Sequence, residues 1–544
     1  MRKASILRVI SGLILVLLAY FFALDSIHIP NIGDEGVYIQ IARKTAESGR
    51  FLPLLDEQGI KNTKPPLLFW QGMVTTAMGK LWSLWNLRGP VVLTTLLVAF
   101  LLGFLAWKIS RDAMKGFLAG FIYLGFMSTL QQGRPFLMHA AETLLLFLPL
   151  VIVFRAQRLN WGRMFACGIF LGLAALYKSY LLVFVGGLAL TLIFAWESRW
   201  RVKHFFKNYG FYLVGTVLLS LGLFSLWLLL DPRPDLVIQD FLLGESVSRF
   251  SITHFFKGLF TGQYSLFRIW LGNLANAGLY FLFLIALVID LVKRRKEISA
   301  DEKRLWLYVL GFLLVYSIPT QRQENYILPT CAALAVLLAL RWQELPSWSF
   351  RASHVLMTIL SGLALWVHVV IAQNLDESLF SPLSYILLSL MLGVAGVSIF
   401  IPKIGRKSFP FLALGFLLAF GLFTKPFSRS FSDETAQKLK GQAVYFPYDF
   451  YAGYEIFRFL LPGVEIRGYW NYQEQLAKSS RFLAVALDLG QPIPEGHRTI
   501  DQIYNLKSRL GRDAGREILF KGRYDLLVNR LVLLERTEQT EIRP

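Results

Sequence analysis

Long apolar runs, separated by short charged connections, dominate the chain. One membrane crossing takes about 20 apolar residues, or somewhat fewer where the helix is buried in protein. On this rule we predict 13 transmembrane helices, near residues 6–24, 90–107, 116–131, 136–154, 164–178, 180–196, 208–230, 268–292, 305–319, 325–341, 353–373, 380–401 and 409–423. Lys178 interrupts the stretch 164–196, which leaves open whether it forms one helix or two. The first run ends at Asp25 without a small-x-small cleavage site, so we interpret it as an uncleaved anchor.

The basic connections predict the orientation of these helices. With the N-terminus inside and 13 crossings, every basic cluster falls on the cytoplasmic side, whereas 12 crossings would turn the later clusters outward. The clusters lie at 2–3, 108–115, 155–163, 199–207, 293–296 and 403–407. This threading places residues 25–89, residues 231–267 and the tail from 424 on the outer side.

The tail from residue 424 to 544 differs from the rest in composition. Charged residues return there, and the short runs 443–448, 482–487 and 526–534 are typical of strands. We therefore predict an all-α polytopic membrane domain over 1–423 and a small extracytoplasmic α/β domain over 424–544.

Composition agrees with a membrane protein. Of the 544 residues, 55% are hydrophobic and 17% charged, and the mean hydropathy is +0.49, so membrane lipids must be the main surroundings. The net charge of +20 and the pI of about 9.8 would suit a nucleic-acid binder, but the topology accounts for the basic excess, and we expect no nucleic-acid partner. Cys167 and Cys331 lie inside apolar runs, which favours neither a disulfide framework nor a metal cluster.

The first outer segment carries two neighbouring acids, Asp34 and Glu35. They precede an amphipathic run over 37–45, whose pattern suits a helix lying in the membrane interface. Pro65 and Pro66 predict the start of a second such helix, with Trp70 at headgroup level. A simpler interpretation makes the two acids favourable charges at a helix N-terminus.

More polar residues converge on the same side of the predicted topology. They come from separate segments and comprise Arg134, His139, Glu142, Lys178, Glu245, Arg249, Gln321, Arg322, Glu324 and Tyr326. An ionisable group at membrane depth is costly and marks a functional site or an internal ion pair. Glu142 and Lys178 are the clearest such groups, and a structural ion pair is the alternative for each. Their convergence favours a site.

These residue types suit the transfer of a sugar from a lipid phosphate. The departing phosphate needs cations, and Lys64, Arg134, Lys178, Arg249 and Arg322 are the candidates. Asp34 is the best-placed base for an acceptor hydroxyl, and Glu142 would share that work or orient the acceptor. If the acceptor is itself a phosphate, Asp34 positions a group instead. No cytoplasmic connection is long enough for a nucleotide-binding domain, which favours a membrane-carried donor.

The order of several motifs resembles a known group. Asp34-Glu35-x-x-Tyr38, followed by Lys64-Pro-Pro and Trp70, is similar to the first periplasmic loop of the GT-C glycosyltransferases. Within them it most resembles the branch of the aminoarabinose lipid A transferases and protein mannosyltransferases. Three more segments agree, namely Glu142-Thr-Leu-Leu-Leu-Phe, Glu245-x-x-x-Arg249-Phe250 and Glu324-Asn-Tyr-Ile-Leu-Pro329.

The resemblance implies a function at the periplasmic face of a bacterial inner membrane. The sugar would pass from a polyprenyl-phosphate donor to lipid A, a glycan or a protein. Asp34 takes the place of the catalytic acid, Glu142 that of a second acid, and Lys64 and Tyr326 those of carrier or phosphate contacts. Glu35, Tyr38, His139 and Glu245 are further candidates. Thr63 stands where aminoarabinose transferases carry an acid, which leaves a divalent metal, and that particular reaction, open.

Two other functions fit the same features less well. A transporter or flippase of lipid-linked sugars would also gather charges along a cavity, but it would line a path to both faces, often with repeat symmetry. A catalytically silent assembly protein on the same scaffold would have no need of Asp34, Lys64 and Glu142 together.

Overall fold

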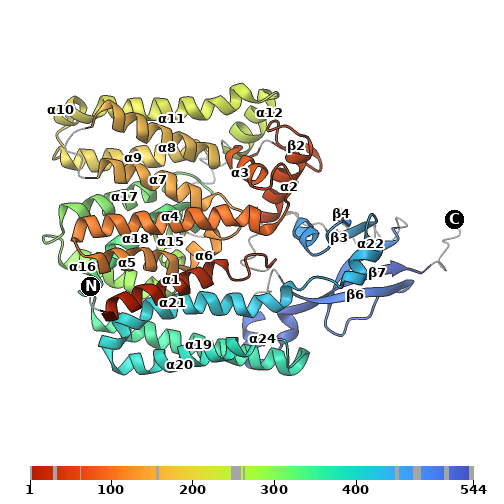
Figure 1. Ribbon diagram of the computed structural model, residues 1–544. Coiled ribbons are helices and arrows are strands. Elements are labelled where there is room, and N and C mark those ends of the chain that lie inside the picture. Colours follow the sequence, from red (N-terminus) through yellow and green to blue (C-terminus); the bar gives the residue numbers. More distant parts are fainter. Residues whose placement is uncertain are drawn as a thin grey trace.

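The computed structural model describes residues 3–27, 34–61, 63–154, 159–246, 259–260, 264–447, 453–469, 480–507 and 514–537. Helices that run side by side form a bundle, and a small β-sheet covers one end of it (Figure 1). The N-terminus lies at the opposite end of the bundle from the sheet.

Each predicted apolar run corresponds to helix in the structure. The bundle helices are α1 (Lys3–Phe21), α4 (Leu84–Ser110), α5 (Ala113–Gly125), α6 (Met127–Gly133), α7 (His139–Val153), α8 (Trp161–Tyr177), α9 (Leu181–Glu197), α10 (Val202–Phe205) continuing through η1 (Phe206–Gly210) into α11 (Phe211–Leu230), α14 (Leu266–Trp270), α15 (Gly272–Ala277), η4 (Gly278–Tyr280), α16 (Phe281–Lys293), α17 (Ala300–Ser317), α18 (Leu328–Arg341), α19 (Ser347–Leu375), α20 (Pro382–Phe400) and α21 (Pro402–Thr424), which continues into η6 (Lys425–Ser428).

The chain is a multi-pass membrane protein. Within the described residues, six helical stretches are long and apolar enough to cross a membrane, and the bent pair α5 and α6 makes a seventh. Five more apolar helices have between 10 and 17 residues. The number of 13 crossings remains a prediction, because these five helices are shorter than the roughly 20 residues that one membrane crossing takes.

Two breaks in the helices shape the end of the bundle that carries the sheet. α5 and α6 meet at an angle of 68° where Phe126 leaves the helical conformation. The stretch over 164–196 forms two helices, because Lys178 has φ −139° and ψ −56° and Ser179 Oγ accepts a hydrogen bond from the Leu181 amide. The break thus brings the Lys178 side chain to the end of α8.

α18 forms the centre of the bundle. Every residue from Leu328 to Leu340 is buried, which its run of small and apolar side chains permits. Around it, glycines allow close helix contacts: a Cβ on Gly116 would lie 2.7 Å from the carbonyl oxygen of Gly103, between α5 and α4.

The segment 34–75 lies at the end of the bundle that carries the sheet (Figure 1). It contains α2 (Asp34–Glu47), the hairpin β1 (Leu55–Asp56) and β2 (Gly59–Ile60), and α3 (Leu67–Thr75), which follows Pro66. The indole nitrogen of Trp70 donates to the carbonyl of Phe51 and ties α3 to the loop after α2. A shorter excursion, α12 (Pro234–Leu236) with η2 (Val237–Ser246), follows α11.

The C-terminal sheet has the strand order β4-β3-β5-β7-β6. β3 (Ala443–Pro447) is parallel to β4 (Glu465–Tyr469) and to β5 (Phe482–Asp488), whereas β7 (Val528–Arg536) is antiparallel to β5 and to β6 (His497–Leu506). α22 (Asp433–Leu439), η7 (Gly453–Phe459), α24 (Ala514–Lys521) and η8 (Tyr524–Leu526) complete this region. The three apolar runs predicted as strands are β3, β5 and β7. β4 and β6 were missed because polar residues interrupt their apolar positions.

Candidate functional site

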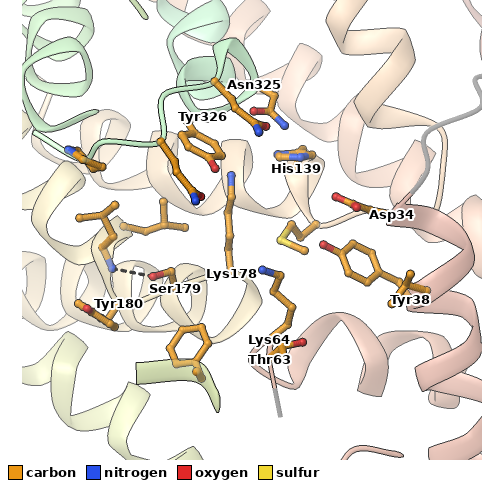
Figure 2. A pocket seen from close by; sticks show the side chains of 18 of the residues that line it. Asp34, Tyr38, Thr63, Lys64, His139, Lys178, Ser179, Tyr180, Asn325 and Tyr326 are labelled. Carbon is orange, nitrogen blue, oxygen red and sulfur yellow. Dashed lines mark hydrogen bonds between the residues drawn. The ribbon is translucent and has the colours of Figure 1, made fainter. Parts of the chain in front are cut away.

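A cavity of about 460 Å³ opens where α2, α7, the α8–α9 break and the segment before α18 meet (Figure 2). Seven of the candidate residues from the sequence line it. Gln321 is described below, and the other six are Asp34, Tyr38, Lys64, His139, Lys178 and Tyr326. They come from five separate parts of the chain, and Asp34 and Tyr326 enter from opposite sides. The predicted convergence of these six is therefore present in the fold.

Asp34 and Glu35 point to different surroundings. Glu35 is buried and accepts two hydrogen bonds of 2.7 Å from the Arg88 guanidinium, and its Oε1 also accepts from the Phe136 amide at 2.7 Å. Asp34, the first residue of α2, is exposed in the cavity, and its carboxylate makes no hydrogen bond or ion pair among the described residues. Glu35 thus anchors the helix, while Asp34 remains available to a ligand.

Three lysines line the same cavity as Asp34. Lys61, Lys64 and Lys178 all line it. The Lys178 Nζ lies 5.4 Å from the centre of the Tyr326 ring, and Tyr326 packs against Tyr316 with ring centres 5.5 Å apart. Lys178 and Lys61 also pair with Glu142 and Asp56, and the three ammonium groups present N–H donors that suit an anionic group such as a phosphate.

Glu142 supports this cavity from behind. It is fully buried in the first turn of α7 and is not among the lining residues. Its Oε2 accepts from the Lys178 Nζ at 2.7 Å and lies 3.0 Å from Nδ1 of His139. Oε1 has no hydrogen-bond partner within the described part of the chain. The geometry suits Glu142 for orienting Lys178 and His139, and a direct approach to an acceptor has no support.

A row of amide side chains forms a further wall, which the sequence reasoning missed in part. Gln321, Gln323 and Asn325 line the cavity. In the sequence they alternate with Arg322 and Glu324. Neighbouring residues of an extended backbone point to opposite sides, which applies up to Gln323, since Glu324–Ile327 form the short 3-10 helix η5. Gln323 has extended backbone angles, φ −132° and ψ 143°. This alternation of amides and charges was the signal that would have identified them.

The same alternation turns Arg322 away from the cavity, contrary to the expected phosphate contact. Its guanidinium is buried and donates to the carbonyls of Ser317 and Tyr264 at 3.0–3.1 Å, and burial lowers its pKa. Glu324 pairs with Arg268, and this hydrogen bonding lowers the pKa of the carboxyl. Both residues hold the amide segment in place.

Arg134 does not reach the cavity either. It is buried after α6 and donates to the carbonyls of Ala19 and Phe22 at 3.3 and 2.7 Å. Carbonyls at a helix C-terminus lack partners within the helix, so Arg134 caps α1. We correct its role from a phosphate contact to a structural cap.

Two expected contacts cannot be placed. Arg249 lies outside the described residues, and so does the side chain of Glu245, whose backbone belongs to η2. Within the residues that are described, no group of three or more His, Cys, Asp or Glu side chains is arranged to hold a metal ion.

Solved structures of another protein have a fold similar to that of this chain over almost its whole length. The crystal structure of ArnT from Cupriavidus metallidurans bound to undecaprenyl phosphate aligns over 97% of both chains with a TM-score of 0.62 and 16% identity. The same enzyme in the apo state aligns over 98% of both chains with a TM-score of 0.59 and 16% identity. No protein-family model and no curated protein sequence matches the chain. The resemblance predicted from the motifs is thus confirmed for the fold, since the chain shares the fold of these ArnT structures over nearly its whole length.

Proposed function

We propose that the chain is a membrane glycosyltransferase that moves a sugar from a polyprenyl-phosphate donor to a lipid A, glycan or protein acceptor. One observation carries this proposal: an uncommitted carboxylate, Asp34, shares a cavity with Lys64 and Lys178. The fold supports the choice of donor, since the similar ArnT structure was solved with undecaprenyl phosphate.

The proposed reaction is a displacement at the anomeric carbon of the donor sugar. An acceptor oxygen bonds to this carbon as its bond to the phosphate oxygen breaks, and polyprenyl phosphate departs with the electron pair. Lys64 and Lys178 stabilise the negative charge of the departing phosphate. Asp34 takes the proton of an acceptor hydroxyl. For an acceptor that is already ionised, Asp34 instead orients the group.

The remaining residues prepare the site. Glu142 holds the Lys178 ammonium through its 2.7 Å hydrogen bond and faces His139. Gln321, Gln323 and Asn325 present amide donors and acceptors to the cavity, which suits the hydroxyl groups of a sugar. Tyr38 and Tyr326 supply aromatic walls.

We place the sheet end of the bundle in the periplasm of a bacterial cell, with residues 424–544 as a separate domain there. The predicted cytoplasmic clusters support this orientation, since α10 and the end of α16 lie at the same end of the bundle as the N-terminus (Figure 1).

The experiment is a donor screen with the purified full chain in lipid nanodiscs. Synthetic polyprenyl phosphates carrying different single sugars are offered with envelope lipid extract, and release of free polyprenyl phosphate is measured. We expect release with at least one donor, dependent on added acceptor. Movement of the intact donor across liposomes without any release would instead identify a flippase and contradict the proposal.

A further inference from the structure

α2 has two functional faces. Asp34, Tyr38 and Ile41 follow the helical spacing and line the cavity. Gln40 and Arg43 point to the other flank, where α2 packs against η7 of the C-terminal region. The cavity-lining residues among those described lie between 34 and 326, so the sheet itself contributes none of them.

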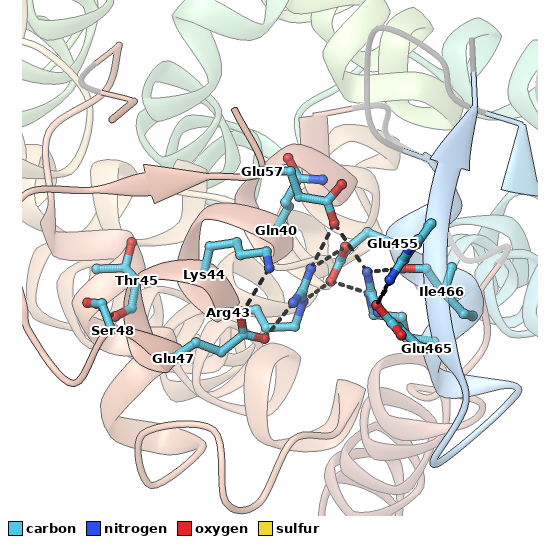
Figure 3. Close-up of polar contacts among 12 residues, drawn as sticks. Gln40, Arg43, Lys44, Thr45, Glu47, Ser48, Glu57, Glu455, Glu465 and Ile466 are labelled. Carbon is cyan, nitrogen blue, oxygen red and sulfur yellow. Dashed lines mark hydrogen bonds and ion pairs between the residues drawn. The ribbon is translucent and has the colours of Figure 1, made fainter. Parts of the chain in front are cut away.

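Arg43 is the centre of this second face (Figure 3). Its Nη2 donates to Glu455 at 3.1 Å, and its Nε donates to the other oxygen of the same carboxylate. Nη1 pairs with Glu47 on α2, and Nη2 also reaches Glu57 in the β1–β2 turn at 3.3 Å. The Glu455 side chain is 0% exposed and that of Arg43 is 12% exposed, so water screens the pair little. A planar guanidinium bound by two oxygens fixes direction as well as distance.

Tyr454, the residue before Glu455, provides a second link. Its hydroxyl accepts from Nε2 of Gln40 at 2.5 Å and donates to Glu57 at 2.6 Å. Arg458, one helical turn further on, contacts Glu455 at 3.0 Å and Glu57 at 3.3 Å. Side chains of η7 therefore bind both α2 and the β1–β2 turn through hydrogen bonds and ion pairs.

The contact joins two guanidinium groups, of Arg43 and Arg458, with the carboxylates of Glu47, Glu57 and Glu455. Burial lowers the pKa of Arg43, but the hydrogen bonds and negative charges of Glu455 and Glu47 together outweigh burial and raise this pKa. A buried ion pair is stable only in a narrow geometry. It therefore fixes the relative orientation of two surfaces more closely than apolar packing does.

We propose that the C-terminal sheet is a positioning element for catalysis: through Glu455 and Tyr454 it sets the placement of α2 and so directs Asp34 into the cavity. This inference rests on the proposed function of Asp34. Tyr454, Glu455 and Arg43 are positioning residues, since none of them lines the cavity.

The test compares Glu455→Gln, Glu455→Asp and Tyr454→Phe with the control Glu465→Gln in the full chain. Glu465 lies on β4 and pairs only with exposed Arg467 among the described residues. We expect Glu455→Gln to lower kcat by about 10- to 100-fold, since a displacement of about 1 Å at a reacting group has this effect. Tyr454→Phe should lower kcat less, Glu455→Asp should recover part of the loss, and Glu465→Gln should match the parent.

Two readouts separate positioning from general damage. Binding of undecaprenyl phosphate should remain within about twofold of the parent, because Lys178 lies outside α2 and is held by Glu142 of α7. Amide hydrogen exchange should accelerate in α2 and remain unchanged in α7. An unchanged kcat, unchanged exchange in α2, or a parallel loss of kcat and binding would overturn the inference.

The same experiments distinguish a failure of the proposed transferase function from a failure of the positioning role of the sheet. The contacts of Arg43 with Glu455 and of Gln40 with Tyr454 are called the clamp. A parent chain that releases no polyprenyl phosphate from any donor refutes the transferase, and with it the catalytic role of the clamp. A parent that is active and variants that are equally active refute the clamp alone.

Discussion

Asp34 and Glu35 show how neighbouring acids divide the work. Glu35 is buried against Arg88, whereas Asp34 faces the cavity without a partner among the described residues. The simple interpretation of two acids at a helix N-terminus accounts for Glu35, which the Phe136 amide and Arg88 satisfy. Asp34 shares the first turn of α2 and also faces the cavity, where its carboxylate is accessible to a ligand.

At the same scale, Lys178 and Glu142 combine structure and chemistry. Replacing Lys178 by Met leaves the fully buried Glu142 carboxylate without its cation, and this should cost about 3 kcal/mol of stability. Adding Glu142→Gln removes the unpaired charge, so the double variant should be more stable than Lys178→Met alone. Thermal unfolding of the solubilised protein measures both.

Lys61→Met is the matched control for this pair. Lys61 lies 3.7 Å from Asp56 and is 37% exposed, and an exposed pair contributes less than about 1 kcal/mol. Equal losses in the Lys178 single variant and the double variant would show that the pair is not coupled.

At the scale of helices, small residues determine how closely the bundle packs. A Cβ on Gly311 in α17 would lie 2.7 Å from the Cα of Ala189 in α9, and backbone cannot move aside as a side chain can. We expect Gly311→Ala to destabilise the protein by about 1–3 kcal/mol, measured by thermal unfolding.

Gly393 in α20 provides the comparison. Nothing lies within 4 Å of a Cβ at this position, so Gly393→Ala should leave stability unchanged or raise it slightly through helix propensity. Similar effects at both positions would contradict the packing account.

Considered as a whole, the molecule has its N-terminus and its sheet at opposite ends of the bundle (Figure 1). The two native cysteines are buried, so an introduced cysteine can be followed without background. Glu434→Cys on exposed α22 should react with an impermeant thiol reagent in intact spheroplasts, whereas Arg295→Cys after α16 should react only after lysis. Labelling of both before lysis would contradict the orientation.

The sequence predicted much of the membrane part because each crossing depends on a local property, an apolar run. It also predicted the helices over α2 and after Pro66, where acids and prolines mark helix starts. The sheet was predicted only in part, since polar residues interrupt the apolar positions of β4 and β6.

The sequence predicted most residues that line the cavity, but it assigned two arginines to the wrong role. Topology alone brought Asp34, Lys64, His139, Lys178 and Tyr326 to one end of the bundle, and the structure places them around one cavity. Topology could not tell which way a side chain points, and for this reason Arg134 and Arg322 were assigned to the phosphate although both satisfy backbone carbonyls. The clamp between Arg43 and Glu455 joins residues 412 positions apart, beyond any local pattern.

The most direct test of the account is the rate of polyprenyl-phosphate release by Asp34→Asn, beside the parent and the control Asp235→Asn. Asp235 is exposed in α12 and lies outside the cavity lining. The account predicts that Asp34→Asn loses at least about 100-fold in rate while still binding undecaprenyl phosphate, and that Asp235→Asn keeps the parent rate. Turnover by Asp34→Asn at the parent rate would contradict it.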